Sequence, residues 1–231
     1  MLELTRELID SRHPHPVHVN VDRSTDVPDE QLRRDLQRYL HDSPMLERVW
    51  IFGYGSLLWK PEVLVARTLK ATVLGFRRRF CLRQVRSRGR PDEPCLMLAL
   101  DSGVSCVSLV QEVRGNNLLE AVWPVWRREM RGHGYVARWV TAYTIDGPVP
   151  ALTFVANKAG HRYLANLSLK TTARMLAAAC GPRGACADYL RETVLKLNEL
   201  GIRDEYMWQL QQLVAEELRR RPAREARRAA D

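Results

Sequence analysis

The sequence lacks any uninterrupted run of the roughly 18 to 20 apolar residues that a membrane-spanning helix needs. Its first eleven residues, Met1 to Ser11, carry too many charges for the apolar centre of a secretory signal peptide. With 45% hydrophobic and 27% charged residues over 231 positions, the composition is that of a globular protein. We therefore expect a soluble, cytoplasmic protein with no membrane partner.

The sequence also lacks the cysteine spacing of a disulfide framework or a zinc site. It has five cysteines, an odd number, and none of them forms a C-x-x-C pair. In a chain without an export signal, such cysteines are typically reduced thiols. A nucleophilic cysteine paired with histidine has no local signature here, so we expect neither a catalytic cysteine nor a bound metal.

Lysine is scarce, since only five of the 36 basic residues are lysines, and the arginines are unevenly distributed. Residues 75–91 contain seven arginines and no acidic residue, and residues 219–231 contain six arginines against two acids. Patches of this kind bind phosphates or small anions, or simply face solvent. Because no stacking aromatic pattern accompanies the arginines, we expect no nucleic-acid partner.

The first part of the chain is predicted to be an extension that is only partly helical. The Pro- and His-rich stretch at 13–18 cannot continue a helix, so we interpret it as a tail or linker. A helix is predicted over about 28–41, beginning at Pro28 and ending before Pro44. We divide the chain into an N-terminal extension (1–45), a main domain (46–218) and an Arg-rich tail (219–231).

Short β-branched and apolar runs in the middle of the chain, bounded by Gly, Pro and Asp, predict five or six strands. These runs lie at 49–52, 72–85, 95–100, 106–113, 135–145 and 151–155. A helix over about 116–130 interrupts them, and Pro124 is expected to kink or break it. Further helices are predicted after Ser168, over 185–200 and after Asp204. Strands followed by helices predict an α+β domain with mostly antiparallel strands in a curved or closed sheet.

The segment V-W-I-F-G-Y-G-S-L-L-W at 49–59 runs from an apolar strand straight into two glycines, Gly53 and Gly55. Successive backbone N–H groups in such a turn can bind a carboxylate, or the oxyanion that develops during acyl transfer. A dinucleotide-binding G-x-G-x-x-G loop is excluded because Leu58 stands where the third glycine would be. The alternative interpretation is a tight turn that needs glycine only for a positive φ.

The segment W-R-R-E-M-R-G-H-G-Y at 126–135 contains Glu129, an isolated acid among arginines. Such a carboxylate stays ionised, and burial in an apolar cleft would raise its proton affinity enough for it to take up a proton and return it. The alternative is an exposed glutamate in surface ion pairs. His133 lies four residues further on, but Gly132 and Gly134 indicate that the helix has ended, and two ligands do not make a metal site.

Five segments occur along the chain in the following order: F-G-Y-G-S-L-L-W-K-P (52–61), G-F-R-R-R-F (75–80), R-E-M-R-G-H-G-Y (128–135), A-L-T-F-V-A (151–156) and G-I-R-D (201–204). Together they resemble the ChaC family of glutathione-specific γ-glutamylcyclotransferases over residues 48–214. The resemblance implies the γ-glutamylcyclotransferase fold, a small mixed β-barrel flanked by helices. It also implies a carbon–nitrogen lyase that uses no cofactor and no metal.

The resemblance implies that Glu129, which falls in the family's R-E-[MA] segment, is the catalytic residue, first as base and then as acid. It also implies a set of substrate-binding residues: Gly53, Tyr54, Gly55, Ser56, Leu57, Leu58 and Tyr135. The implied reaction cyclises the γ-glutamyl group of glutathione, the small-molecule partner, into 5-oxoproline and releases Cys-Gly. In this scheme one side of the strand that carries Arg77, Arg78 and Arg79 could bind a substrate carboxylate, and the alternative is a solvated barrel exterior.

Two other functions stay open. The same chemistry could act on another γ-glutamyl amine or dipeptide, or the protein could be a non-catalytic regulatory or binding member of the fold. The chain departs from the family pattern in its first 45 residues, at Pro124 and at Cys186, and this leaves its substrate range open. The sequence does not predict an oligomeric state.

Overall fold

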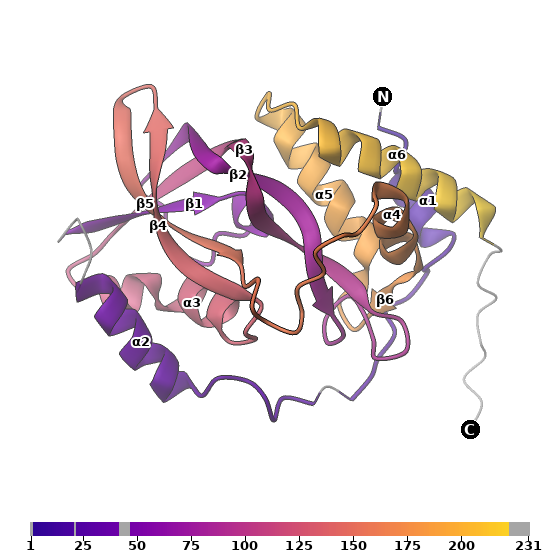
Figure 1. Ribbon diagram of the computed structural model, residues 1–231, viewed down its shortest axis with the longest axis horizontal. Helices are drawn as coiled ribbons and strands as arrows, with labels where there is room; N and C mark the ends of the chain where they lie inside the picture. Colours follow the sequence, from indigo (N-terminus) through magenta and orange to yellow (C-terminus); the bar gives the residue numbers. More distant parts are fainter. Residues whose placement is uncertain (1, 21, 42–46, 222–231) are drawn as a thin grey trace. The chain divides into compact units, whose positions relative to one another are not determined.

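The computed structural model describes residues 2–20, 22–41 and 47–221 (Figure 1). These residues fall into two compact units. The described residues within Arg23–Leu82 and Leu98–Tyr163 form the barrel unit, and those within Met1–Asp22, Arg83–Met97 and Leu164–Asp231 form the helical unit. Every residue of the candidate site lies in the barrel unit.

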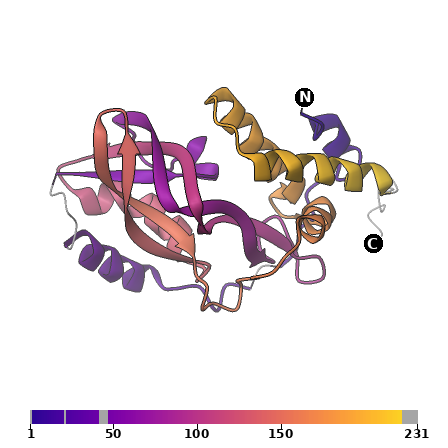
Figure 2. The ribbon, with the colours of Figure 1, turned by 45° about the horizontal axis from the view of Figure 1, so that its top comes forward.

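The barrel unit is built on a closed barrel, drawn in Figure 2. Its five strands follow the order β1-β3-β2-β4-β5. Its strands are β1 (Arg48–Gly53), β2 (Arg67–Gln84), β3 (Cys95–Arg114), β4 (Tyr135–Thr144) and β5 (Gly147–Ala156). β1 pairs antiparallel with β3, β2 with β4, and β4 with β5, whereas β5 runs parallel to both β1 and β3. The mixed, closed barrel confirms the α+β class expected from the sequence.

The two strands expected at 95–100 and 106–113 are in fact one continuous strand, β3. The Asp-Ser-Gly sequence between them suits a turn, but Asp101 is buried in the barrel unit, with 3% of its surface exposed. Its carboxylate lies 2.8 Å from an Arg79 guanidinium nitrogen and 3.0 Å from Lys158 Nζ. Although burial opposes ionisation, the hydrogen bonds from Arg79 and Lys158 lower the pKa of Asp101 to about 2. These tertiary contacts override the local preference for a turn.

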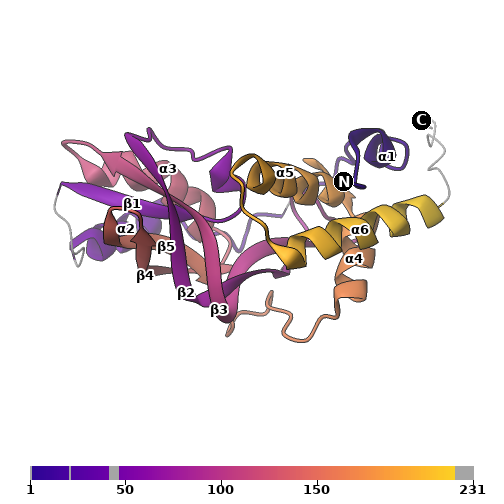
Figure 3. The same cartoon turned by 90° about the horizontal axis from the view of Figure 1, so that it is seen from above.

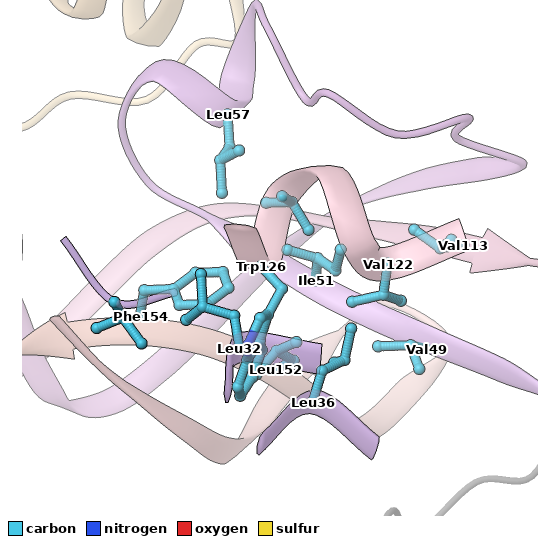
Figure 4. Packing of buried hydrophobic residues seen from close by; sticks show 12 residues of the cluster. Leu32, Leu36, Val49, Ile51, Leu57, Val113, Val122, Trp126, Leu152 and Phe154 are labelled. Carbon is cyan, nitrogen blue, oxygen red and sulfur yellow. The ribbon is translucent and has the colours of Figure 1, made fainter. Parts of the chain in front are cut away.

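Two helices pack against the barrel (Figure 4). They are α2 (Asp29–His41), which confirms the helix predicted over 28–41, and α3 (Leu118–Met130). They share one buried cluster with β1 and β5, which includes Leu32, Leu36, Val49, Ile51, Val122, Trp126, Leu152 and Phe154. α3 continues through Pro124, so the helix is not broken there. The proline removes only its own backbone N–H from the helix, and Trp126, two residues further on, holds the helix in the core. Pro44, expected to end α2, lies outside the described residues.

The helical unit contains four helices among its described residues, together with a short strand pair (Figure 3). These elements are α1 (Arg6–Asp10), α4 (Leu169–Ala178), β6 (Cys180–Gly181), β7 (Gly184–Ala185), α5 (Cys186–Glu199) and α6 (Glu205–Arg220). Side-chain oxygens of Ser168 and Asp204 accept backbone N–H groups and cap α4 and α6, as the sequence predicted. Of the predicted tail, residues 222–231 lie outside the described part of the chain.

Part of the N-terminal extension packs into the helical unit and is not a free tail. The side-chain oxygen of Gln211 accepts the backbone N–H groups of Glu3 and Leu4 at 2.9 and 3.0 Å. His13 is only 8% exposed, and its Nε2 lies 2.8 Å from the carbonyl oxygen of Ala177. The interpretation of His13 as part of a linker is therefore wrong, because burial outweighs the polar composition that suggested it.

All five cysteines are buried and none of them forms a disulfide, in agreement with the predicted reduced thiols. Burial raises the pKa of the Cys81 thiol to about 12, which disfavours the reactive thiolate.

In the described part of the chain, no helix is both long and apolar enough to cross a membrane.

The packing of α2 gives a direct stability prediction. Leu36 is fully buried in the core of the barrel unit, so Leu36→Ala is expected to lower the free energy of unfolding by about 2 to 5 kcal/mol. Gln37, the next residue on the same helix, is exposed, and Gln37→Ala should change this free energy by less than about 0.5 kcal/mol. Urea denaturation measures both variants. Equal effects of the two substitutions would contradict the placement of α2.

Candidate active site

We call residues 53–58 the glycine turn. It begins at Gly53, the last residue of β1, and includes the short helix that follows. A side chain at position 53 would bring its Cβ to within 3.1 Å of the Leu57 Cβ, so the close approach of the turn to β1 favours glycine. Gly55 precedes the short 3-10 helix η1 (Ser56–Leu58) and has a φ of −136°. Neither glycine has a positive φ, so the explanation that this motif needs glycine for a positive φ is wrong.

The side chains of the turn anchor it to the barrel. Tyr54 is 6% exposed and donates its hydroxyl to the carbonyl oxygen of Phe154 at 2.6 Å. Leu57 and Leu58 are also buried. Tyr135, at the start of β4, donates its hydroxyl to the carbonyl oxygen of Leu98 at 2.8 Å.

The backbone of the turn presents a set of hydrogen-bond donors. The N–H group of Leu58 donates to the carbonyl oxygen of Gly55 at 2.9 Å. The N–H groups of Gly55, Ser56 and Leu57, in contrast, donate to no acceptor among the described residues. Three consecutive donors of this kind suit a negatively charged group.

Glu129 is the next-to-last residue of α3, and 13% of its side chain is exposed. Its Oε1 lies 3.2 Å from Nε of Arg128. Burial raises the pKa of Glu129 above its usual value of 4.5; Arg128 opposes this shift and Glu62 adds to it. Glu129 is thus not the exposed surface glutamate of the alternative interpretation. It is a partly paired, largely buried carboxylate with an increased proton affinity.

Arg128 connects Glu129 to the glycine turn. Besides the contact of its Nε with Glu129, one terminal nitrogen donates to the hydroxyl of Ser56. The other donates to the carbonyl oxygen of Lys60 at 2.9 Å and lies 3.3 Å from a carboxylate oxygen of Glu62. The structure therefore brings together two of the predicted site residues, Ser56 and Glu129, through an arginine that the sequence analysis treated only as cationic surroundings.

Glu62 was also missed by the sequence analysis. Its backbone has a φ of 62°, uncommon for a residue with a side chain. Its carboxylate lies 3.4 Å from Lys60 Nζ in addition to its contact with Arg128. No sequence signal marks it, because its role depends on the fold that places residues 60–62 beside the end of α3.

The structure gives no metal-ligand role to Glu129 and His133. Helix α3 ends at Met130, and His133 follows in a turn with a φ of 54°, so the two side chains do not share a helical face. Over residues 2–20, 22–41 and 47–221, no group of three or more His, Cys, Asp or Glu side chains is arranged to hold a metal ion.

The three consecutive arginines of β2 do not form a solvated exterior. Arg78 is 3% exposed and donates to the carbonyl oxygens of Tyr54 at 2.7 Å and Val107 at 2.8 Å. Arg79 is bound to Asp101, and only Arg77 is exposed. Arg78 thus contacts the glycine turn itself.

A hollow of about 610 Å³ lies in the helical unit, beside α5 and α6. It is lined by Asn198, Gly201, Ile202, Arg203, Glu205, Trp208, Gln209 and Gln212. None of these is a predicted site residue. The candidate site is therefore defined by the contacts of Glu129 and the glycine turn, and not by this hollow.

A closed mixed barrel with these features is the γ-glutamylcyclotransferase fold. The solved structure of a γ-glutamyl cyclotransferase specific to glutathione from yeast superposes with a TM-score of 0.69, covering 74% of this chain and 97% of that one at 18% identity. At that identity the likeness concerns the fold alone.

Sequence comparison gives the family. The model of the family described as ChaC-like protein matches residues 49–217, and the chain belongs to this family. A glutathione-specific γ-glutamylcyclotransferase of Escherichia coli (strain K12) is 34% identical over 158 residues, which are 68% of this chain and 68% of the relative. The glutathione-specific γ-glutamylcyclotransferase 1 of Danio rerio is 31% identical over 147 residues, 62% of this chain and 75% of the relative.

Proposed function

We propose that this protein cyclises the γ-glutamyl group of glutathione, forming 5-oxoproline and releasing Cys-Gly. The relatives described above are named glutathione-specific γ-glutamylcyclotransferases. The observation that carries the proposal is the environment of Glu129: a carboxylate with 13% of its side chain exposed, a raised pKa, and a connection through Arg128 to the glycine turn. We assign the activity to residues 46–218 and place it in the cytoplasm.

The reaction is an intramolecular transfer in which the substrate supplies its own nucleophile. The α-amino nitrogen of the γ-glutamyl residue attacks the γ-carbonyl carbon, a new C–N bond closes the five-membered ring, and the bond to the cysteine nitrogen breaks. No water is consumed and no atom is oxidised or reduced. Because the reacting groups are already tethered, the protein mainly has to fold the substrate, move a proton and stabilise an oxyanion.

Glu129 moves the proton in this proposal. As an ionised carboxylate it takes a proton from the substrate ammonium, and as a carboxylic acid it returns the proton to the departing cysteine nitrogen. The second proton that the ring nitrogen loses goes to the released amine, so that Cys-Gly leaves as an ammonium. A carboxylate with an ordinary pKa would be a weak base for the first step and would hold little acid for the second. Burial raises the pKa of Glu129 and so helps both steps.

The glycine turn holds a negatively charged group of the substrate. The N–H groups of Gly55, Ser56 and Leu57 are the donors in our proposal, and they act on a carboxylate of glutathione or on the oxyanion of the tetrahedral intermediate. Gly53, Tyr54 and Leu58, the remaining residues of the turn, support them. Tyr135 completes the proposed substrate site.

The test is product identification with the purified full chain. Incubation with glutathione should release 5-oxoproline and Cys-Gly in equal amounts, both identified by mass spectrometry. A γ-glutamyl amine and a γ-glutamyl dipeptide, compared by kcat/KM, establish the substrate class. Absence of products from glutathione would contradict the proposal. Turnover of only the other compounds would retain the chemistry with a different substrate, and binding without turnover would indicate the regulatory alternative.

A further inference from the structure

Two polar side chains of the barrel, one from β2 and one from β3, donate hydrogen bonds to backbone carbonyls of the glycine turn. Arg78 Nε donates to the carbonyl oxygen of Tyr54 at 2.7 Å. Gln111 Nε2 donates to the carbonyl oxygen of Leu57 at 3.1 Å. Both side chains are almost fully buried, with 3% of Arg78 and 5% of Gln111 exposed. The two bonds fix the first and the last peptide of the turn.

Fixing a carbonyl also fixes the N–H group of the following residue. A trans peptide is planar, so the carbonyl oxygen and the next N–H point in opposite directions, and no cis peptide is present in the described chain. When Arg78 holds the Tyr54 carbonyl, the N–H group of Gly55 therefore points away from Arg78. The Gly55 carbonyl is in turn occupied by the Leu58 N–H, which directs the N–H group of Ser56.

The last donor is directed in the same way. The carbonyl oxygen of Ser56 accepts the N–H group of Lys60 at 2.8 Å, so the N–H group of Leu57 points in the opposite direction. Gln111 holds the Leu57 carbonyl, so the following N–H group, that of Leu58, points the opposite way and donates to the Gly55 carbonyl. The three donors that lack an acceptor in the described chain, those of Gly55, Ser56 and Leu57, are thus each opposite an occupied carbonyl.

Besides its hydrogen bond to the turn, Gln111 has a second feature, which a contribution to the stability of the fold does not explain. Its side-chain oxygen is buried and has no hydrogen-bond partner within the described residues. This oxygen lies 3.6 Å from the point that a Cβ on Gly53 would occupy, next to the turn. An unsatisfied buried acceptor destabilises a fold, whereas an apolar side chain of similar size would carry no such penalty.

We propose that Arg78 and Gln111 are positioning residues that direct the N–H groups of Gly55, Ser56 and Leu57 toward a negatively charged group of the substrate. The inference rests on the proposed function and deepens it. Neither side chain contacts the reacting atoms. Arg78 fixes the peptide that carries the Gly55 donor, and Gln111 fixes the peptide whose N–H group, that of Leu58, holds the Gly55 carbonyl and so directs the Ser56 donor. A polar side chain at residue 111 is retained at the expense of stability because the turn must be rigid before the substrate arrives.

Gln111→Met tests this proposal, because it removes the bond to the turn and the unsatisfied acceptor together while keeping a similar volume. We expect kcat/KM for glutathione to fall by about tenfold while the thermal midpoint stays the same or rises. The pH at which kcat/KM is half-maximal should not move, since the contacts of Glu129 are intact. Gln211→Met is the matched control, because Gln211 is also a buried amide with one unpartnered atom, but it belongs to the helical unit. Its kcat/KM should stay within twofold of the wild-type value.

Arg78→Met is expected to have a larger effect, on the order of 10²-fold in kcat/KM, but the loss of a buried guanidinium can also prevent folding. The positioning role is therefore judged from Gln111→Met and not from Arg78→Met. An unchanged kcat/KM in folded Gln111→Met, or a fall that Gln211→Met reproduces, would overturn the proposal.

A binding measurement separates this inference from the proposed function. In Glu129→Gln, labelled with ¹⁵N, the amide resonances of Gly55, Ser56 and Leu57 should shift on addition of glutathione. Adding Gln111→Met to this variant should raise the Kd obtained from the shifts by about tenfold. If the wild type forms no product but these shifts occur and depend on Gln111, the proposed function fails and the positioning role stands. If the shifts are absent, or do not depend on Gln111, the positioning role fails.

Discussion

Glu129→Gln is expected to reduce kcat with glutathione by about 10² to 10⁴-fold, the usual contribution of a residue that transfers protons in the transition state. Glutamine has nearly the same shape, so the contacts that place the side chain at the end of α3 persist, but it cannot accept a proton. KM should change much less than kcat. The measurement is steady-state formation of 5-oxoproline at saturating glutathione.

Glu120→Gln is the matched control for this variant, since Glu120 lies in the first turn of the same helix, is 54% exposed and pairs with Arg33. Its kcat should stay within twofold of the wild-type value. Far-ultraviolet circular dichroism and the thermal midpoint show whether both variants are folded. Equal activity of folded Glu129→Gln and the wild type would exclude Glu129 as the proton carrier.

Arg128→Gln is the second prediction with a large effect. The arginine holds Glu129 by its Nε and contacts the Ser56 hydroxyl and the Lys60 carbonyl by its terminal nitrogens, and a glutamine cannot make all of these bonds. We expect kcat/KM to fall on the order of 10²-fold because the base and the turn lose their common support. The pKa of Glu129 should rise further, because Arg128 is the group that lowers it. The pH at half-maximal kcat/KM should therefore move upward.

Glu62→Gln should shift this pH in the opposite direction. The Glu62 carboxylate raises the pKa of Glu129, and its removal also frees Arg128 to interact more strongly with Glu129. Arg127→Gln is the control, since Arg127 pairs with Asp29 and lies beside Arg128 in the sequence. It should leave the pH profile unchanged. Shifts of the same sign in Arg128→Gln and Glu62→Gln would contradict the electrostatic description of the site.

Much of the fold could be predicted from the sequence because local signals and tertiary packing agree there. Ser168 and Asp204 are capping residues by chemistry, and both cap helices in the structure. The spacing of Leu32 and Leu36 predicted an amphipathic helix, and both side chains are buried in the core of the barrel unit. The N-terminal ends of α4 and α6 are set by hydrogen bonds between residues three positions apart, so the sequence around each cap is enough to predict them.

The differences arise where a distant part of the chain supplies the decisive contact. Asp101 would favour a turn in isolation, but Arg79 and Lys158 hold it inside a continuous strand. His13 lies in a polar, proline-rich stretch, yet the fold buries it against Ala177. None of these three partners is near in sequence, so no local pattern could have indicated the contacts.

The candidate site also combines residues that local sequence motifs indicate with residues that only contacts between distant segments reveal. The sequence motifs marked Glu129 and the glycine turn as separate segments. The sequence could not show that Arg128 joins them, because its bonds to Ser56 and Lys60 span about seventy residues. Nor could it show Gln111, which a reader of the sequence would place on an ordinary strand. The sequence motifs indicated the residues to which we assign the chemistry, whereas the groups that we propose to orient them became visible only in the fold.

The most direct test of the central claim is the pH dependence of kcat/KM for the wild-type protein with glutathione. Glu129 must be ionised to accept the proton, so activity is present above its pKa and is lost as the pH falls through it. Because burial raises this pKa above the usual 4.5, the half-maximal point of the acid limb should lie above pH 4.5. A rate that stays constant as the pH falls through 4.5, in protein shown to remain folded, would contradict the claim that a buried carboxylate carries the proton.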